Sequence, residues 1–435
     1  MEFCSQAMYL LCGGVCHVVG TDDREEGIKL PTAKHYGQPQ TLSEGYPGQS
    51  ALFRWETKVI CATGMEGALV ERVRAEPFHR VTPLLESWAL SRVAGMPVFL
   101  KYENVQPAGS FKIRGIGHFC QQMAMRGCRH LVCSSGGNAG IAAAYSARKL
   151  GIPVTIVLPE NTSMQVVRRL EGEGAEVQLT GKVWDEANIR AQDLATRDGW
   201  VNVSPFDHPL IWEGHASLVR ELKESLGTPP GAVVLAVGGG GLLAGVTAGL
   251  LEVGWQHVPI IAMETRGAHS FNAALQAGRL VALPDITSVA RSLGAKTVAA
   301  RTLECAKECE VLSEVVEDQE AVRAVQRFLD DERMLVEPAC GAALAAVYSG
   351  ILGRLQAEGR LGPALASIVV IVCGGNNISS QQLQELKTQL GSLGDKAKPY
   401  TFWASTLPLS HNQLGKDLTP PSGWLNSSET QFLLL

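Results

Sequence analysis

Short apolar runs rich in β-branched residues alternate with longer amphipathic segments from Pro77 onward. The apolar runs have the composition of buried strands, and they predict strands at 98–102, 130–134, 154–158, 176–180, 233–237, 260–264 and 368–373. The amphipathic segments predict helices at 111–126, 139–149, 163–173, 185–198, 211–225, 242–252 and 318–334. This alternation is typical of parallel sheets covered by helices on both faces, so the sequence predicts an α/β fold.

The two ends of the chain lack this alternation of apolar and amphipathic segments. Residues 1–64 are rich in turn formers and lack a periodic pattern, so we expect a loosely ordered N-terminal extension there. The same reasoning predicts a flexible C-terminal tail at 393–435. At 435 residues the chain is long enough for about two or three domains, and the patterned region is 65–392. Whether Met1 or Met65 is the main start stays open.

Charge and hydropathy narrow the function classes. The 38 basic and 43 acidic residues are interspersed and give a net charge of −5, so we expect no nucleic-acid partner. No apolar run reaches the roughly 18 to 20 residues that cross a bilayer, so no membrane partner is expected. The N-terminal apolar run has no basic segment before it, and several cysteines lie in apolar runs. We therefore expect reduced thiols and a cytoplasmic protein.

A run of four glycines follows the strand predicted at 233–237. Backbone N–H groups and the start of the next helix can bind an anion there, and phosphate is the expected ligand. A dinucleotide-binding site is an alternative to a phosphate site. Gly239, Gly241 and Ala244 fit the motif G-x-G-x-x-A, and Glu264 lies where a ribose-binding acid would be. An NAD-dependent oxidoreductase is therefore an open alternative.

Two more predicted strands end in clusters of small polar residues, at 134–140 (SSGGNAG) and at 374–377 (GGNN). Ligands of open α/β sheets bind at the carboxyl ends of strands, so the three clusters predict one composite pocket. The hydroxyls, amide and N–H groups of 134–140 suit a carboxylate. A capped turn, with Ser135 or Asn138 as the helix cap, is the simpler alternative.

Lys112 stands at the start of a predicted helix, between Phe111 and Ile113. A lysine in such a place is usually solvated. Its apolar and glycine neighbours indicate instead that the amine points inward, where desolvation lowers its pKa and frees its lone pair. A buried lysine beside a phosphate cradle is what an aldehyde cofactor needs.

The motifs S-F-K-x-R-G at 110–115, SSGGNAG at 134–140, GGGGL at 238–242 and CGGN at 373–376 occur in this order. Together they resemble the pyridoxal-phosphate enzymes of the tryptophan-synthase-β type, and specifically the serine/threonine dehydratases. The resemblance implies the fold-type II architecture: two open, twisted parallel-sheet domains with helices on both faces and the cofactor, pyridoxal 5′-phosphate, in the cleft between them.

The resemblance also implies a domain division and an assembly. A small domain of about 106–205 would be inserted into a large domain made of about 65–105 and 206–392. Members of the family favour dimers, so a homodimer is possible. The partners otherwise expected are small amino-acid substrates.

Site residues follow from the same resemblance. Lys112 would form the Schiff base with the cofactor and then act as the base at Cα of the substrate. The other cofactor contacts would be Phe111 and Asn138 at the ring and its 3′ oxygen, Cys373 at the ring nitrogen, and Gly238, Gly239, Gly240, Gly241 and Leu242 at the phosphate. The substrate carboxylate would be bound by Ser134, Ser135, Gly136 and Asn138. A monovalent cation, K⁺, would be held by Glu264 with Gly238 and Ala268.

The implied reaction is β-elimination. L-Serine would give pyruvate and ammonia, and L-threonine would give 2-oxobutanoate and ammonia. The thiol of Cys373 is too weak an acid to protonate the ring nitrogen, which suits elimination. Gly136 stands where the liver serine dehydratase pattern has alanine, so we expect low turnover. A weakly active cofactor-binding relative, or a racemase, stays open as an alternative.

Overall fold

The computed structural model describes residues 11–12, 15–16 and 76–391. Leu11–Cys12 (β1) and Val15–Cys16 (β2) pair as short antiparallel strands within a unit formed by the first 60 residues. All other described residues belong to a second unit. The extension predicted for 1–64, apart from β1 and β2, and the tail predicted for 393–435 lie outside the described residues.

The larger of the two sheets in the second unit has six strands in the order β11-β10-β9-β12-β4-β3. All neighbouring strands are parallel except β3 and β4, which are antiparallel. The bounds are β3 Leu84–Glu86, β4 Val98–Tyr102, β9 Ala232–Ala236, β10 Ile260–Thr265, β11 Val311–Val316 and β12 Ile368–Val372. Every residue of β9, β10 and β12 is buried, as expected for central strands with both faces covered.

The smaller sheet has four parallel strands in the order β7-β6-β5-β8. Their bounds are β5 His130–Cys133, β6 Val154–Leu158, β7 Glu176–Leu179 and β8 Trp200–Asn202. The predicted α/β class with two parallel sheets is thus confirmed. The antiparallel edge strand β3 and the strands β8 and β11 were not predicted, because each is short or carries partly exposed residues.

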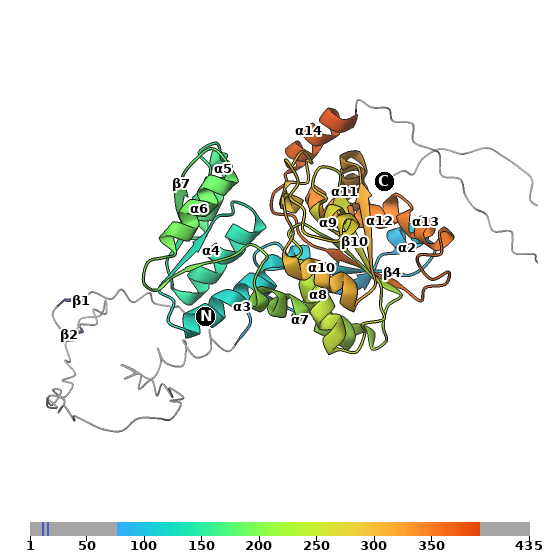
Figure 1. The fold of residues 1–435 in the computed structure, drawn as a ribbon, viewed down its shortest axis with the longest axis horizontal. Coiled ribbons are helices and arrows are strands. Elements are labelled where there is room, and N and C mark those ends of the chain that lie inside the picture. Colours follow the sequence, from blue (N-terminus) through green and yellow to red (C-terminus); the bar gives the residue numbers. More distant parts are fainter. Residues whose placement is uncertain (1–10, 13–14, 17–75, 392–435) are drawn as a thin grey trace, which may run out of the picture. The chain divides into compact units, whose positions relative to one another are not determined.

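Helices cover both sheets (Figure 1). Those whose sequence lies among the strands of the smaller sheet are α4 Asn138–Leu150, α5 Met164–Gly172 and α6 Trp184–Leu194, with α3 Lys112–Met125 before them. Those that follow are α7 Pro209–Leu226, α8 Gly241–Glu252, α9 Ser270–Ala277, α10 Ala300–Glu308, α11 Asp318–Glu332, α12 Pro338–Tyr348, α13 Ile351–Ala357 and α14 Ser380–Gly391, and α2 Trp88–Ala94 precedes β4. Two short 3-10 helices are η1 Glu103–Val105 and η2 Arg291–Leu293.

Helices α3 and α7 connect the two sheets through their packing. Helix α3 packs on α4 and on α7, and α7 packs on α8 (Figure 1). The crossing of α3 and α7 is close, because a Cβ atom on Gly115 would lie 2.5 Å from the carbonyl oxygen of Ile211, and one on Gly214 would lie 2.4 Å from that of Arg114. Glycine is needed at both positions for this approach. The first turn of α3 is therefore held firmly against α7.

The proposed division at about 106 and 205 is consistent in position with the sheets, since the strands of the smaller sheet all lie between these residues. The boundaries themselves remain a prediction. Among the described helices, none is by itself long and apolar enough to cross a bilayer; α12 and α13 reach that length and composition only together, across a 48° bend.

Candidate active site

Helix α3 begins at Lys112, and its N-terminal end has no capping side chain. The amine Nζ donates a hydrogen bond of 2.5 Å to the carbonyl oxygen of Pro205. Burial of this amine lowers the pKa of Lys112 to about 8, although Cys133, Cys373 and Glu337 partly oppose the shift. A large fraction of the amine is therefore neutral at weakly alkaline pH, as a nucleophile or base requires.

Phe111 lies next to this amine. Its backbone N–H donates to the carbonyl oxygen of Cys373, at 3.1 Å, which ties the start of α3 to the end of β12. Its ring centroid is 5.4 Å from Nζ of Lys112 and 5.0 Å from the ring of His215 on α7. The structure thus brings together Lys112, Phe111 and Cys373, which the sequence predicted as site residues.

Asn138 is the first residue of α4 and is buried. Its Nδ2 donates a 2.5 Å hydrogen bond to Oε1 of Glu337, the residue before α12. Glu337 is buried, and desolvation raises the pKa of its carboxyl group. Asn138 Oδ1 and Glu337 Oε2 have no hydrogen-bond partner among the described residues.

Sequence reasoning missed Glu337. Acidic residues before a proline at a helix start are common, so the residue type alone carries no special signal. The apolar segment that precedes it, Leu335-Val336, was the available clue that the carboxylate is buried.

The glycine loop connects β9 to α8, which begins at Gly241 without a capping side chain. Gly240 has φ = 92°, in the left-handed region that favours glycine. Close packing is a second reason for glycine in this loop, and the sequence did not reveal it. At Gly239 a Cβ atom would lie 2.3 Å from the ring of Phe206, and at Gly240 a Cβ atom would lie 1.9 Å from Oγ1 of Thr302. The hydroxyl of Thr302 is buried and has no partner in the described part of the chain.

The serine-rich loop 134–140 is attached to α6. Ser134 is buried, its hydroxyl donates to Oδ1 of Asn188 at 2.8 Å, and its carbonyl oxygen accepts from Nε1 of Trp184 at 2.7 Å. Its polar groups are thus directed to α6. The hydroxyl of Ser135 accepts from the N–H of Gly137, at 3.3 Å, rather than from the first turn of α4. Substrate contacts of this loop stay a prediction.

Cys373 follows β12 and is buried beside Cys340 of α12. The Cys340 thiol and burial raise the pKa of Cys373 well above its usual range. The thiol therefore stays protonated at physiological pH, which strengthens the expectation that this residue is a very weak acid.

Glu264 and Ala268 lie at the end of β10 and in the turn after it. Both carboxylate oxygens of Glu264 accept backbone N–H groups of α9, from Phe271 at 2.9 Å and Asn272 at 2.7 Å. Burial raises the pKa of Glu264 to about 8. A fully buried carboxyl group that is engaged with α9 does not suit the ribose contact of the nicotinamide alternative.

The cation prediction is left untested by this geometry. Ser270, at the start of α9, has a buried hydroxyl without a partner among the described residues. In the same part of the chain, no group of three His, Cys, Asp or Glu side chains could hold a metal ion.

These residues fit pyridoxal phosphate. The lysine amine has a lowered pKa, the uncapped start of α8 suits a phosphate, and the orphaned oxygen of Thr302 lies beside it. Asn138 Oδ1 and Glu337 Oε2, which have no hydrogen-bond partner among the described residues, form a second buried polar site at which a ligand can bind.

The sequence model of the family described as pyridoxal-phosphate dependent enzyme matches residues 75–374. The chain belongs to this family, and its cofactor is pyridoxal 5′-phosphate. This finding gives no support to the nicotinamide alternative.

The chain is also similar to several individual proteins. The chain is 93% identical over 327 residues to a mouse protein named serine dehydratase-like, covering 75% of this chain and 99% of the relative. It is 61% identical over 317 residues to human L-serine dehydratase/L-threonine deaminase, covering 73% and 97%. Among solved structures, a fungal L-serine ammonia-lyase from Rhizomucor miehei superposes with a TM-score of 0.68 at 39% identity, covering 72% of this chain and 99% of that one.

Proposed function

We propose that the chain is a pyridoxal-phosphate-dependent ammonia-lyase that converts L-serine to pyruvate and ammonia, and L-threonine to 2-oxobutanoate and ammonia. The observation that carries this proposal is the buried amine of Lys112, whose pKa is lowered to about 8 and whose surroundings include the buried carboxyl group of Glu337. The names of the relatives, serine dehydratase-like and L-serine dehydratase/L-threonine deaminase, support the substrate class.

The bound cofactor supplies an aldehyde that links to amines and a ring that withdraws electrons from Cα of the amino acid. Lys112 then acts as the base: its Nζ, a large fraction of which is neutral at weakly alkaline pH, accepts the Cα proton. The carbonyl oxygen of Pro205, 2.5 Å from Nζ, orients the amine. Loss of the Cα proton and of the β-hydroxyl together removes one water from the substrate, and later uptake of one water releases the keto acid and ammonia.

Asn138 and Glu337 would also hold the cofactor ring. Glu337 accepts one hydrogen of the Asn138 amide, so the second hydrogen on Nδ2 is available to the phenolic oxygen of the cofactor. Phe111 would pack against the ring, and Cys373, kept protonated, would lie at the ring nitrogen without giving it a charge.

The phosphate would be bound at the start of α8. Backbone N–H groups of Gly238, Gly239, Gly240, Gly241 and Leu242 and the positive end of the helix provide the anion site. The hydroxyl of Thr302 adds a donor that the sequence did not suggest.

The remaining site residues complete the proposal. We assign the substrate carboxylate to the loop of Ser134, Ser135, Gly136 and Asn138, with Ser135 and the backbone N–H groups as the available donors because the Ser134 hydroxyl is bound to Asn188. A Cβ atom at Gly136 would lie 3.1 Å from Val166. Glycine thus leaves this loop slightly looser than alanine would, which supports low turnover.

A K⁺ ion would be held by Glu264 with the carbonyl oxygens of Gly238 and Ala268, and the orphaned hydroxyl of Ser270 supports a polar ligand there. Homodimer formation and a cytoplasmic location remain predictions.

A product assay tests the proposed reaction. The purified full chain is loaded with pyridoxal phosphate and incubated with L-serine and, separately, with L-threonine, and keto acid, ammonia and D-amino acid are quantified. We expect keto acid and ammonia in equal amounts. D-Serine as the main product would establish a racemase instead, and no product from either substrate would favour a cofactor-binding relative without lyase activity.

A further inference from the structure

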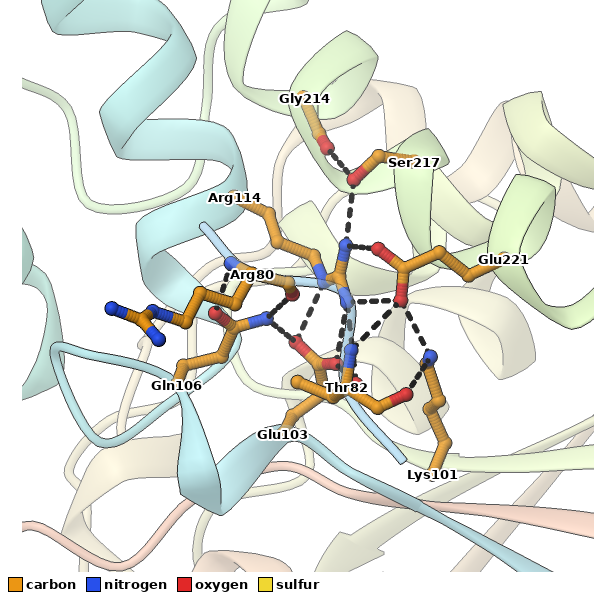
Figure 2. Close-up of polar contacts among 9 residues, drawn as sticks. All are labelled: Arg80, Thr82, Lys101, Glu103, Gln106, Arg114, Gly214, Ser217 and Glu221. Carbon is orange, nitrogen blue, oxygen red and sulfur yellow. Dashed lines mark hydrogen bonds and ion pairs between the residues drawn. The ribbon is translucent and has the colours of Figure 1, made fainter. Parts of the chain in front are cut away.

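A group of buried charged side chains lies outside the site described above (Figure 2). We call it the buried charge network, and it consists of Lys101 on β4, Glu103 on η1, Arg114 on α3 and Glu221 on α7. Lys101, Glu103 and Arg114 have no exposed surface, and Glu221 is nearly buried. Two positive and two negative groups balance, so the network carries no net charge.

Arg114 is at the centre of this network. Its Nε and Nη2 donate to the two carboxylate oxygens of Glu103, both at 2.7 Å, and its Nη1 and Nη2 donate to the two oxygens of Glu221, at 2.6 and 2.8 Å (Figure 2). The remaining N–H of Nη1 is directed to Oγ of Ser217, at 3.0 Å. All five donors of the guanidinium group are thus used, in two forked pairs.

The other members complete the network. Nζ of Lys101 donates to Oε2 of Glu221 at 2.5 Å and to the carbonyl oxygen of Thr82 at 2.7 Å. The hydroxyl of Thr82 and Nε2 of Gln106 donate to Glu103, at 2.6 and 3.2 Å (Figure 2).

Stability alone is a weak reason for such an arrangement. Burying four charged groups has a large desolvation cost, and well-packed apolar residues often stabilise a fold as well as buried ion pairs do. Forked ion pairs provide precise positioning, because each pair fixes both the distance between its two side chains and their relative orientation. The network therefore fixes the orientation of α3 relative to η1 and α7.

The part of α3 that is fixed is the part that carries Lys112. Arg114 lies two residues further along the helix, about 200° around its axis at 3.6 residues per turn, so the two side chains leave α3 on nearly opposite sides. The start of α3 has no capping side chain, and backbone contacts just before it, of Phe111 with Cys373 and of Ser110 with Gly374, connect it to the end of β12. A rotation of α3 about its axis, which Arg114 resists, would move Nζ of Lys112 away from the carbonyl oxygen of Pro205.

We propose that Arg114 is a positioning residue for Lys112: the buried charge network holds the first turn of α3 so that the amine faces the cofactor aldehyde. Arg114 is absent from the groups whose charge shifts the pKa of Lys112. The effect is therefore expected to be geometric. The inference rests on the proposed cofactor chemistry at Lys112, and its test separates the two.

The test measures how fast Lys112 is linked to the cofactor. Apoprotein is mixed with pyridoxal phosphate, samples are reduced with borohydride at intervals, and the modified Lys112 peptide is quantified by mass spectrometry. The reduction adds hydride to the C=N bond and leaves a stable secondary amine. The absorption spectrum of the bound cofactor is recorded in parallel, and all variants are compared well below their melting temperatures.

Arg114→Lys keeps the charge but loses both forks. A misplacement of about 1 Å can cost about 100-fold in rate, so we expect labelling to slow by about 10- to 100-fold and the absorption band to change. Arg220→Lys is the matched control, since Arg220 forms a forked pair with Glu252, at 2.8 and 2.9 Å, on the exposed side of α7. Lys101→Met is the second control, because it destabilises the same network without removing a bond of α3.

The outcomes separate the explanations. Slow labelling in Arg114→Lys with rates near wild type in both controls supports the proposal. A rate in Arg114→Lys within about threefold of the wild type, or an equal loss in Lys101→Met, overturns it. If Arg114→Lys does not fold, Ser217→Ala, which removes one acceptor of Arg114, must slow labelling measurably or the proposal is wrong. Absence of labelling at Lys112 in the wild type would instead contradict the proposed function.

Discussion

The buried charge network and the predicted cofactor site differ in how completely their buried polar atoms are paired. In the buried charge network, the five donors of Arg114 all have acceptors. Among the residues predicted to surround the cofactor, Asn138 Oδ1, Glu337 Oε2 and Thr302 Oγ1 have no partner among the described residues. Native proteins pair nearly all buried polar groups, so we expect the unpaired region to bind a ligand and the paired region to hold that site in place.

The largest effect is expected from breaking the paired region. Glu103→Gln removes a carboxylate that accepts two hydrogen bonds from Arg114 and leaves part of that charge uncompensated. The free energy of unfolding of the apoprotein should fall by about 3 to 5 kcal/mol. Urea unfolding followed by circular dichroism measures it, with Glu252→Gln at the exposed Arg220 pair as the control, for which at most about 1 kcal/mol is expected. Equal losses in the two variants would contradict a special role of the buried network.

The second effect concerns the glycine loop. Gly240→Ala places a Cβ atom against the hydroxyl of Thr302 and forces alanine into φ = 92°. We expect apoprotein that still folds but has lost most of its affinity for the cofactor, by about 100-fold or more. Fluorescence titration with pyridoxal phosphate checks this.

Gly227→Ala is the matched control for Gly240→Ala. Gly227 also has positive φ, 69°, but a Cβ atom there would meet nothing within 4 Å. Both variants thus place alanine at a positive φ, but the cofactor site is untouched in Gly227→Ala. If both variants lose the same affinity, general destabilisation explains the result and the loop has no special role.

A third change separates stability from binding within the unpaired region. Thr302→Val replaces a buried hydroxyl that has no partner with a methyl group of the same shape. The apoprotein should be as stable as the wild type or more stable, by up to about 1 kcal/mol, whereas cofactor affinity should fall about tenfold. Thermal melts with and without pyridoxal phosphate measure both quantities. A variant that loses apoprotein stability and keeps its affinity would show that Thr302 is only a packing residue.

The smallest effect is a shift on the pH axis. Labelling of Lys112 by pyridoxal phosphate should rise as pH increases through about 8, because only the neutral amine reacts and burial lowers its pKa to that value. Glu337 raises the pKa of Lys112, since a negative neighbour favours the ammonium form. Glu337→Gln should therefore move the midpoint to lower pH, and a midpoint at higher pH would contradict the placement of Glu337.

Sequence patterns predicted the part of this picture that depends on local order. Lys112, the glycine loop and Cys373 could be found because each directly follows a turn or an apolar strand run, and buried parallel strands end at one edge of a sheet. The strands β3, β8 and β11 could not, because they are short or half-exposed and their pairing comes from distant strands.

What the sequence did not reveal depends on contacts between distant segments. Glu337 reaches Asn138 across 199 positions of the chain. Thr302 and Phe206 close on the glycine loop from other elements. The hydroxyl of Ser134 is part of a predicted substrate motif, yet its direction is decided by Asn188 of α6. No local pattern encodes these distances.

The central claim, that Lys112 carries the reaction, is tested most directly by Lys112→Ala in a pyruvate assay on L-serine with full-length, cofactor-supplemented protein. Lys149→Ala, which removes an exposed lysine of α4, is the control. Because only the side-chain amine of Lys112 is lost, the variant should keep the circular dichroism spectrum of the wild type and release no pyruvate above background, while the control keeps the wild-type rate. Pyruvate release by folded Lys112→Ala at more than a few per cent of the wild-type rate would contradict the account.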